Sequence, residues 1–101
     1  GAQPIAAQPL RFALHENMPN PFNAETLIRF DLPNDALASL DVFNALGQKV
    51  RTLVQGRLAA GRHQLRWDSR DDRDTPLASG VYFYRLVAGE RVQTQRMMLV
   101  K

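Results

Sequence analysis

The chain has 101 residues, of which 45% are hydrophobic and 23% are charged, and it contains no cysteine. This length allows one domain with one modest core, and the composition is that of a globular protein and not of a disordered or fibrous one. The net charge of +3 comes mainly from arginines that are scattered one per segment, whereas a nucleic-acid binder clusters its basic residues and places aromatic residues among them. We therefore expect no nucleic-acid partner, and the short apolar runs predict no membrane span.

The chain is expected to begin with a linker over residues 1–13. Up to about Arg11 the sequence is small and polar, contains two prolines and shows no periodicity. Residues 17–23 follow with two further prolines, which fix their own φ and favour extended geometry in the residues before them. We predict an ordered, extended corner here, in which three asparagines close local turns and Phe22 anchors the corner in a core.

Four strands follow, each indicated by apolar residues that alternate with polar ones. Gly47 lies in a turn before the third of them, where a positive φ is expected. Three of the strands are indicated by residues expected to share one face, which are Ile28, Phe30 and Leu32, then Leu40 and Val42, and last His63, Leu65 and Trp67. The third strand in chain order is marked by Val50, Leu53 and Val54 and is expected to end at residues 55–56.

Two longer strands are predicted over residues 81–88 and 91–101, joined by a tight turn at Gly89 and Glu90. No segment shows a helical period, and the strands recur about every dozen residues with turn residues between them. The sequence therefore predicts an all-β fold, an immunoglobulin-like antiparallel β-sandwich of about seven strands.

The residues that could support catalysis do not form a known arrangement. None of the serines or histidines lies in a G-x-S-x-G or H-E-x-x-H pattern, and no glycine-rich loop opens a helix. His63 shares a face with Leu65 and Trp67, so we expect a half-buried structural histidine there, and His15, beside the linker, is expected to be exposed. We predict no catalytic residues, no enzymatic activity and no cofactor.

Two clusters have both a functional and a structural interpretation. Asp68, Asp71, Asp72 and Asp74 could bind calcium, but arginines lie inside the run and aspartates also favour turns for local reasons. We favour the turn and expect no metal site. Three aromatic residues could form a sugar-binding platform, but they alternate in strands, which favours the core. They are Trp67, Tyr82 and Tyr84.

Several motifs, in order along the chain, resemble one family. They are residues 16–23, 26–30, 32–33, 42–50, 60–63, 67–68, 79–86 and 96–101. From Leu14 to Lys101 the sequence resembles the C-terminal sorting domain of the type IX secretion system, in the subgroup related to the immunoglobulin-like domain of the flagellar hook-capping protein. The sequence departs from the family pattern at three turn positions, where Asn44 replaces aspartate and Ser69 and Asp74 replace glycines.

This resemblance implies a non-catalytic sorting signal over residues 14–101 that follows an upstream cargo domain. Such domains pass through the periplasm and reach the cell surface or the medium. Their partners are an outer-membrane shuttle and a surface sortase, which cuts upstream of the sandwich and attaches the cargo to anionic lipopolysaccharide. In this chain the cut would fall within residues 1–14, and we expect the domain to be a monomer.

The last two strands suggest where the secretion partners bind. Residues 81–84 and 97–100 are apolar on both faces, so one face of each strand joins the core and the other forms an apolar strip. We expect this strip to dock a partner, and the last strand to offer an edge for strand addition. The register is open, because a one-residue bulge exchanges the faces, and the strip could instead pack under a loop or the other sheet. The partner-binding residues that we predict are Gly80, Val81, Tyr82, Phe83, Arg96, Met97, Met98, Leu99, Val100 and Lys101.

Two other functions fit a β-sandwich of this size. The domain could be a structural spacer that packs on an upstream domain of a surface enzyme. It could also be a carbohydrate-binding module, which requires Trp67 or a tyrosine to lie flat on the surface.

Overall fold

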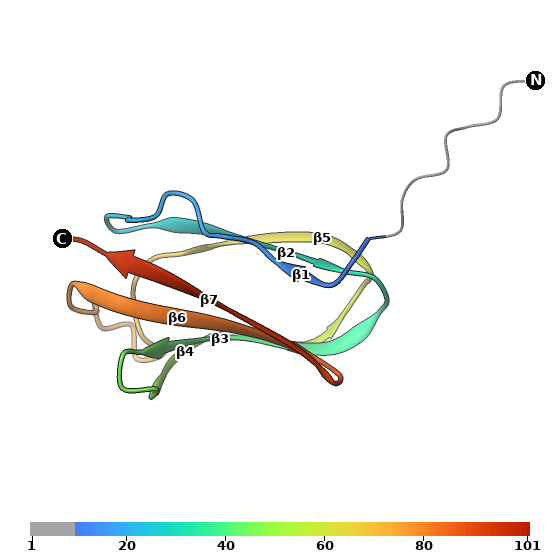
Figure 1. Cartoon of the computed structure of the whole chain (residues 1–101). Coiled ribbons are helices and arrows are strands. Elements are labelled where there is room, and N and C mark those ends of the chain that lie inside the picture. The colour runs from blue at the N-terminus through green and yellow to red at the C-terminus, as the bar shows by residue number, and fades with distance from the viewer. Residues whose placement is uncertain (1–9) are drawn as a thin grey trace, which may run out of the picture.

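The computed structural model describes residues 10–101 as two stacked antiparallel sheets (Figure 1). None of these residues is helical, so the described chain has no helix that could cross a membrane. The all-β immunoglobulin-like sandwich predicted from the sequence is confirmed. The smaller sheet has the order β1-β2-β5, with β1 at Ala13–Leu14, β2 at Thr26–Leu32 and β5 at Gly61–Trp67. The larger sheet has the order β4-β3-β6-β7, with β3 at Ala36–Asn44, β4 at Lys49–Leu58, β6 at Gly80–Ala88 and β7 at Arg91–Leu99.

The core lies between the two sheets and is built from alternate residues of the central strands. In β2, Ile28, Phe30 and Leu32 are each at most 1% exposed, as the alternation in the sequence predicts. They face Leu40 and Val42 of β3, which are fully buried. Burying one such aliphatic or aromatic side chain contributes about 1.5–3 kcal/mol, so these paired faces hold the sheets together.

The turn between β6 and β7 fixes the register that the sequence leaves open. Gly89 has a φ of 62°, and the two strands pair without a bulge from Ala88 opposite Arg91 to Gly80 opposite Leu99. With this register Tyr82 shares a face with Met97, and Tyr82, Tyr84 and Met97 are all buried in the core. The neighbouring residues of β6, Val81 and Phe83, therefore point away from the core, because successive side chains of a strand alternate between faces.

Several boundaries differ from those expected. Strand β4 continues to Leu58, beyond the end that the apolar pattern indicates, and β7 ends at Leu99 and not at Lys101. At the other end, Phe12 packs against the core and β1 begins at Ala13, so the folded unit starts just before the expected boundary at residue 14. Most of the predicted linker lies outside the described residues.

The corner over residues 17–23 joins the two sheets at one end of the sandwich. Phe22 is 2% exposed and its ring lies 5.8 Å from that of Trp67, so its predicted role as an anchor is confirmed. Asn17 closes a local turn by donating to the backbone oxygen of Pro19. Asn20 does not close a local turn as expected. Its amide instead binds the backbone of Arg96 and Met98 in β7, because the corner runs alongside that strand.

Candidate docking surface

The two histidines are held by contacts within the domain. The ring of His63 stacks on Phe30 with centroids 4.9 Å apart, which confirms the half-buried structural position expected for it. The expectation that His15 is simply exposed is wrong. β1 pairs with β2, and this pairing brings the His15 Nε2 atom to 2.9 Å from the Asp31 carboxylate.

Three of the four aspartates in the loop between β5 and β6, Asp68, Asp71 and Asp72, accept hydrogen bonds from backbone N–H groups, whereas the Asp74 carboxylate pairs with Arg70. Asp71 accepts hydrogen bonds from the backbone N–H groups of Arg73 and Thr75, both at 2.9 Å. Asp72 accepts one from the N–H of Thr52 and so fixes the loop to β4. These contacts confirm the turn interpretation. Within residues 10–101, no three acidic or histidine side chains are grouped so that they could hold a metal ion.

The same loop contains two of the positions at which the sequence departs from the family pattern. Ser69 has a φ of 60° and Asp74 has a φ of 63°, which is the left-handed region that glycine adopts most readily. Asp enters this region more easily than most residues, so Asp74 is tolerated there. Ser69 is 4% exposed, and its hydroxyl donates to the backbone oxygen of Ala24.

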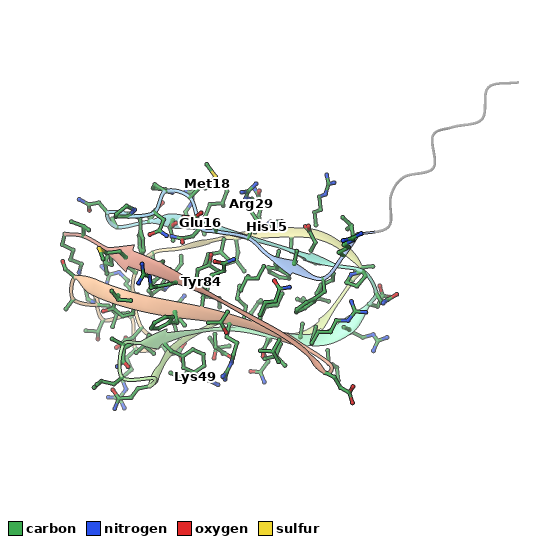
Figure 2. The ribbon with its side chains drawn as sticks, in the orientation of Figure 1. His15, Glu16, Met18, Arg29, Lys49 and Tyr84 are labelled. Carbon is green, nitrogen blue, oxygen red and sulfur yellow. The ribbon has the colours of Figure 1, made fainter. Side chains whose placement is uncertain are left out.

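The aromatic residues considered as a sugar platform lie in the core. Trp67 and Tyr84 are fully buried and Tyr82 is 6% exposed, so none lies flat on the surface, and the carbohydrate-binding alternative loses its basis. Figure 2 shows Tyr84 between the two sheets. Its hydroxyl donates to the backbone oxygen of His15, and that of Tyr82 donates to Ala78. Burial raises the pKa of both tyrosines above the ordinary value, so both remain neutral hydrogen-bond donors.

The predicted partner-binding residues divide between the two faces of the larger sheet. Tyr82, Met97 and Leu99 are buried in the core, so in the folded domain they are inaccessible to a partner. Gly80 is half-buried at the start of β6. The other six residues, which are Val81, Phe83, Arg96, Met98, Val100 and Lys101, are half-buried or exposed.

The outward residues form an apolar patch near the C-terminal end of β7. Val81 pairs with Met98, and Phe83 pairs with Phe43 of β3, a residue that the sequence analysis did not include. Met98 is 41% exposed and Val100 is 47% exposed, whereas the other three residues are half-buried. The expected apolar strip is therefore confirmed, and it extends onto β3. We call it the C-terminal patch, consisting of Phe43, Val81, Phe83, Met98 and Val100.

The edge of β7 beside this patch is already occupied. The backbone N–H of Phe22 donates to Met98, and the N–H of Val100 donates to Phe22. The Asn20 amide binds the same edge at Arg96 and Met98. The expected strand addition at this end of β7 is therefore contradicted, because the corner over residues 17–23 takes the hydrogen bonds that an added strand would need.

Two basic side chains lie beside Phe43 at one border of the C-terminal patch. The Arg85 guanidinium lies 4.6 Å from the centroid of the Phe43 ring. Lys49 pairs with Phe43 across β4 and β3, and its Nζ atom lies 3.7 Å from the Asp41 carboxylate. In Figure 2, Lys49 lies on the side of the sandwich opposite Met18 and Arg29. The patch is therefore an apolar surface with a cationic border.

The chain was compared with known families and structures. The model of the FlgD Ig-like domain family matches residues 18–93. A search of curated proteins found no match. Among solved structures, the fold is similar to part of dimeric latent PorU from Porphyromonas gingivalis, with a TM-score of 0.71 and 16% identity over 86% of this chain.

Two further solved structures contain a similar fold. One is PorZ, described as an essential bacterial surface component of the type-IX secretion system of P. gingivalis, with a TM-score of 0.58 and 19% identity over 87% of this chain. The other is FlgD from P. aeruginosa, with a TM-score of 0.58 and 20% identity over 73% of this chain. The chain covers 9% of PorU, 11% of PorZ and 58% of FlgD, so each contains much more than this domain.

Proposed function

Because the chain belongs to the FlgD Ig-like domain family, we propose that it is a non-catalytic sorting domain, which directs an exported cargo protein through the type IX secretion system. Its partners are then an outer-membrane shuttle and a surface sortase, and its destination is the cell surface or the medium. The motifs over residues 14–101 and the similarity to parts of PorU and PorZ support this proposal.

The observation that carries the proposal is the uncovered C-terminal patch. An antiparallel sheet with one solvated face normally alternates apolar residues inward with polar residues outward. Here β6 keeps Val81 and Phe83 on the outward face, and no strand of residues 10–101 covers them. Contiguous apolar residues that stay uncovered mark binding surfaces, and a sorting signal requires one.

The proposal is tested by attaching the whole chain to the C-terminus of a reporter enzyme that carries an export signal. The fusion is expressed in P. gingivalis and in a strain without PorZ, and reporter activity is measured on intact cells and in the medium. We expect reporter activity on the surface or in the medium of P. gingivalis, and we expect the reporter to stay inside the cells of the strain without PorZ. Equal external activity in both strains, or none in the first, would contradict the proposal. A reporter without the chain is the control.

The role of the patch is tested by substitution within the same fusion. Met98→Ser and Phe83→Ser should abolish most of the external activity, whereas Leu37→Ser should preserve it, because Leu37 is 69% exposed at the other end of the sheet. Thermal unfolding of each purified domain shows whether it folds. If the patch variants fail to fold, the loss of external activity reports on stability and the docking role is rejected for those residues.

A further inference from the structure

The larger sheet has a strong excess of positive charge. Its four strands contain six basic residues and a single acidic one, Asp41. Asp41 is 6% exposed, accepts a hydrogen bond from the Thr52 hydroxyl at 2.8 Å and lies 3.7 Å from Lys49. The only carboxylate in these strands is therefore already engaged inside the sheet surface.

Two arginines beside the C-terminal patch have no such partner. Arg85 pairs with Asp41 in the strand register, yet its guanidinium lies over the Phe43 ring and makes no ion pair within the described chain. Arg96 pairs with Phe83 and likewise has no ion pair among residues 10–101. A guanidinium that rests on an aromatic ring keeps its N–H edge free to bind a carboxylate in a fixed direction.

An apolar patch bordered by two arginines that form no ion pair within the described residues is complementary to a surface that carries carboxylates around an apolar centre. We propose that the C-terminal patch, with Arg85 and Arg96 at its borders, binds an acidic protein surface, whose carboxylates pair with the two arginines around an apolar centre. The inference rests on the proposed function, since the protein in question is the component of the secretion system that recognises the domain. Apolar centres with charged rims are the usual anatomy of protein interfaces.

A protein fits this surface better than a lipid membrane does. The phenylalanines of the patch are half-buried in a pleated sheet, with cations beside them. Insertion into a membrane surface requires apolar side chains that project several ångströms beyond their surroundings. Three of the five residues of the patch are only half-buried side chains within the sheet, which suits contact with another folded surface better than insertion.

Charge reversal in the reporter fusion tests the inference. Arg85→Glu and Arg96→Glu should each lower external activity about ten-fold, since like charges across an interface repel. Arg62→Glu is the matched control, because Arg62 is exposed in β5 on the smaller sheet and its change in charge is the same. Arg96 is exposed and its side chain makes no hydrogen bond within residues 10–101, so that variant should fold even if Arg85→Glu does not.

The outcomes separate the inference from the proposed function. If wild-type export depends on PorZ but the Arg96→Glu fusion is exported as well as the Arg62→Glu fusion, the acidic-partner inference is overturned and the sorting function stands. If wild-type export does not depend on PorZ, the sorting function itself fails.

A direct binding experiment distinguishes a protein from a lipid. A photoreactive residue is placed at Thr94, opposite Arg85, and cells that export the fusion are irradiated. A cross-link to a secretion-system protein with an acidic surface, weakened by Arg96→Glu but not by Arg62→Glu, supports the inference. Binding of the domain to phosphatidylglycerol vesicles that Arg96→Glu abolishes, with no protein cross-link, overturns it in favour of a membrane.

Discussion

The hydroxyl group of Tyr84 donates a hydrogen bond to the backbone oxygen of His15. Tyr84 is fully buried in the centre of the larger sheet, and His15 follows β1 in the smaller sheet. Glutamine side chains of β7 reinforce the same junction, because Gln93 and Gln95 bind backbone groups of Phe12 and Leu14. The N-terminal segment is thus held against the larger sheet by side chains and not by strand pairing.

Removing the Tyr84 hydroxyl should therefore loosen this junction. We expect Tyr84→Phe to lower the free energy of unfolding by about 1–2 kcal/mol, because the His15 carbonyl loses its partner in a partly buried position. Tyr82→Phe is the matched control, with an expected loss of at most about 1 kcal/mol, since its acceptor lies only four residues away in the chain. Urea denaturation followed by the fluorescence of Trp67 measures both, and equal stability of Tyr84→Phe and wild type would contradict the role assigned to this bond.

The buried tyrosines also predict how stability changes at alkaline pH. Burial raises the pKa of Tyr84 in the folded state, whereas in the unfolded chain it is about 10. The folded state then holds the proton more tightly, so this stabilisation is complete below pH 10 and is lost as the pH rises towards the folded-state pKa. Unfolding free energies at pH 8 and pH 11 should differ less for Tyr84→Phe than for wild type. An equal difference in the two proteins would show that Tyr84 does not contribute.

The strand alternation was sufficient to predict the fold class, but not the faces of β6 and β7. Because Val81 and Phe83 are as apolar as Tyr82 and Tyr84, periodicity could not tell which pair enters the core. The unbulged pairing across Gly89 places Val81 on the same face as Met98 and Tyr82 on the same face as Met97, and packing between the sheets buries the second face. The position of Asn20 could not be predicted either, since its partners lie 76 and 78 residues away in the chain.

The candidate site shows a similar division. Phe83 and Met98 were among the predicted partner-binding residues because both strands are apolar on both faces, but so were Tyr82 and Met97, which the structure places in the core. Phe43 and Arg85 were missed, because their contact depends on the pairing of β3 with β6, which a single sequence does not specify. The missing information was that β3 pairs with β6, although β4 and β5 lie between them in the chain.

The contact between Asn20 and β7 gives a prediction about the edge of the larger sheet. Asn20→Ala removes hydrogen bonds to the backbone of Arg96 and Met98, which should cost about 1 kcal/mol of unfolding free energy. Hydrogen exchange at the Met98 amide should be faster, because its acceptor is lost. The exposed edge should also promote association between molecules, which light scattering detects.

Asn23→Ala is the control for this substitution. Asn23 is exposed in the same corner, and its side chain makes no hydrogen bond within the described part of the chain. Its stability and Met98 exchange should match those of wild type. If Asn20→Ala and Asn23→Ala show the same unfolding free energy and the same Met98 exchange rate, the Asn20 side chain does not hold the corner, and Phe22 and its backbone bonds do.

Ala24 offers a substitution that should stabilise the domain. Its φ is 72°, a left-handed conformation that costs an L-residue with a Cβ roughly 1–2 kcal/mol. Ala24→Gly removes most of that cost but adds freedom to the unfolded chain, so we expect a net gain of about 0.5–1 kcal/mol in unfolding free energy. Ala45→Gly, in a turn where φ is not positive, should instead destabilise slightly. Urea denaturation of both variants tests the difference, and a loss of stability in Ala24→Gly would mean that its backbone does not carry this strain.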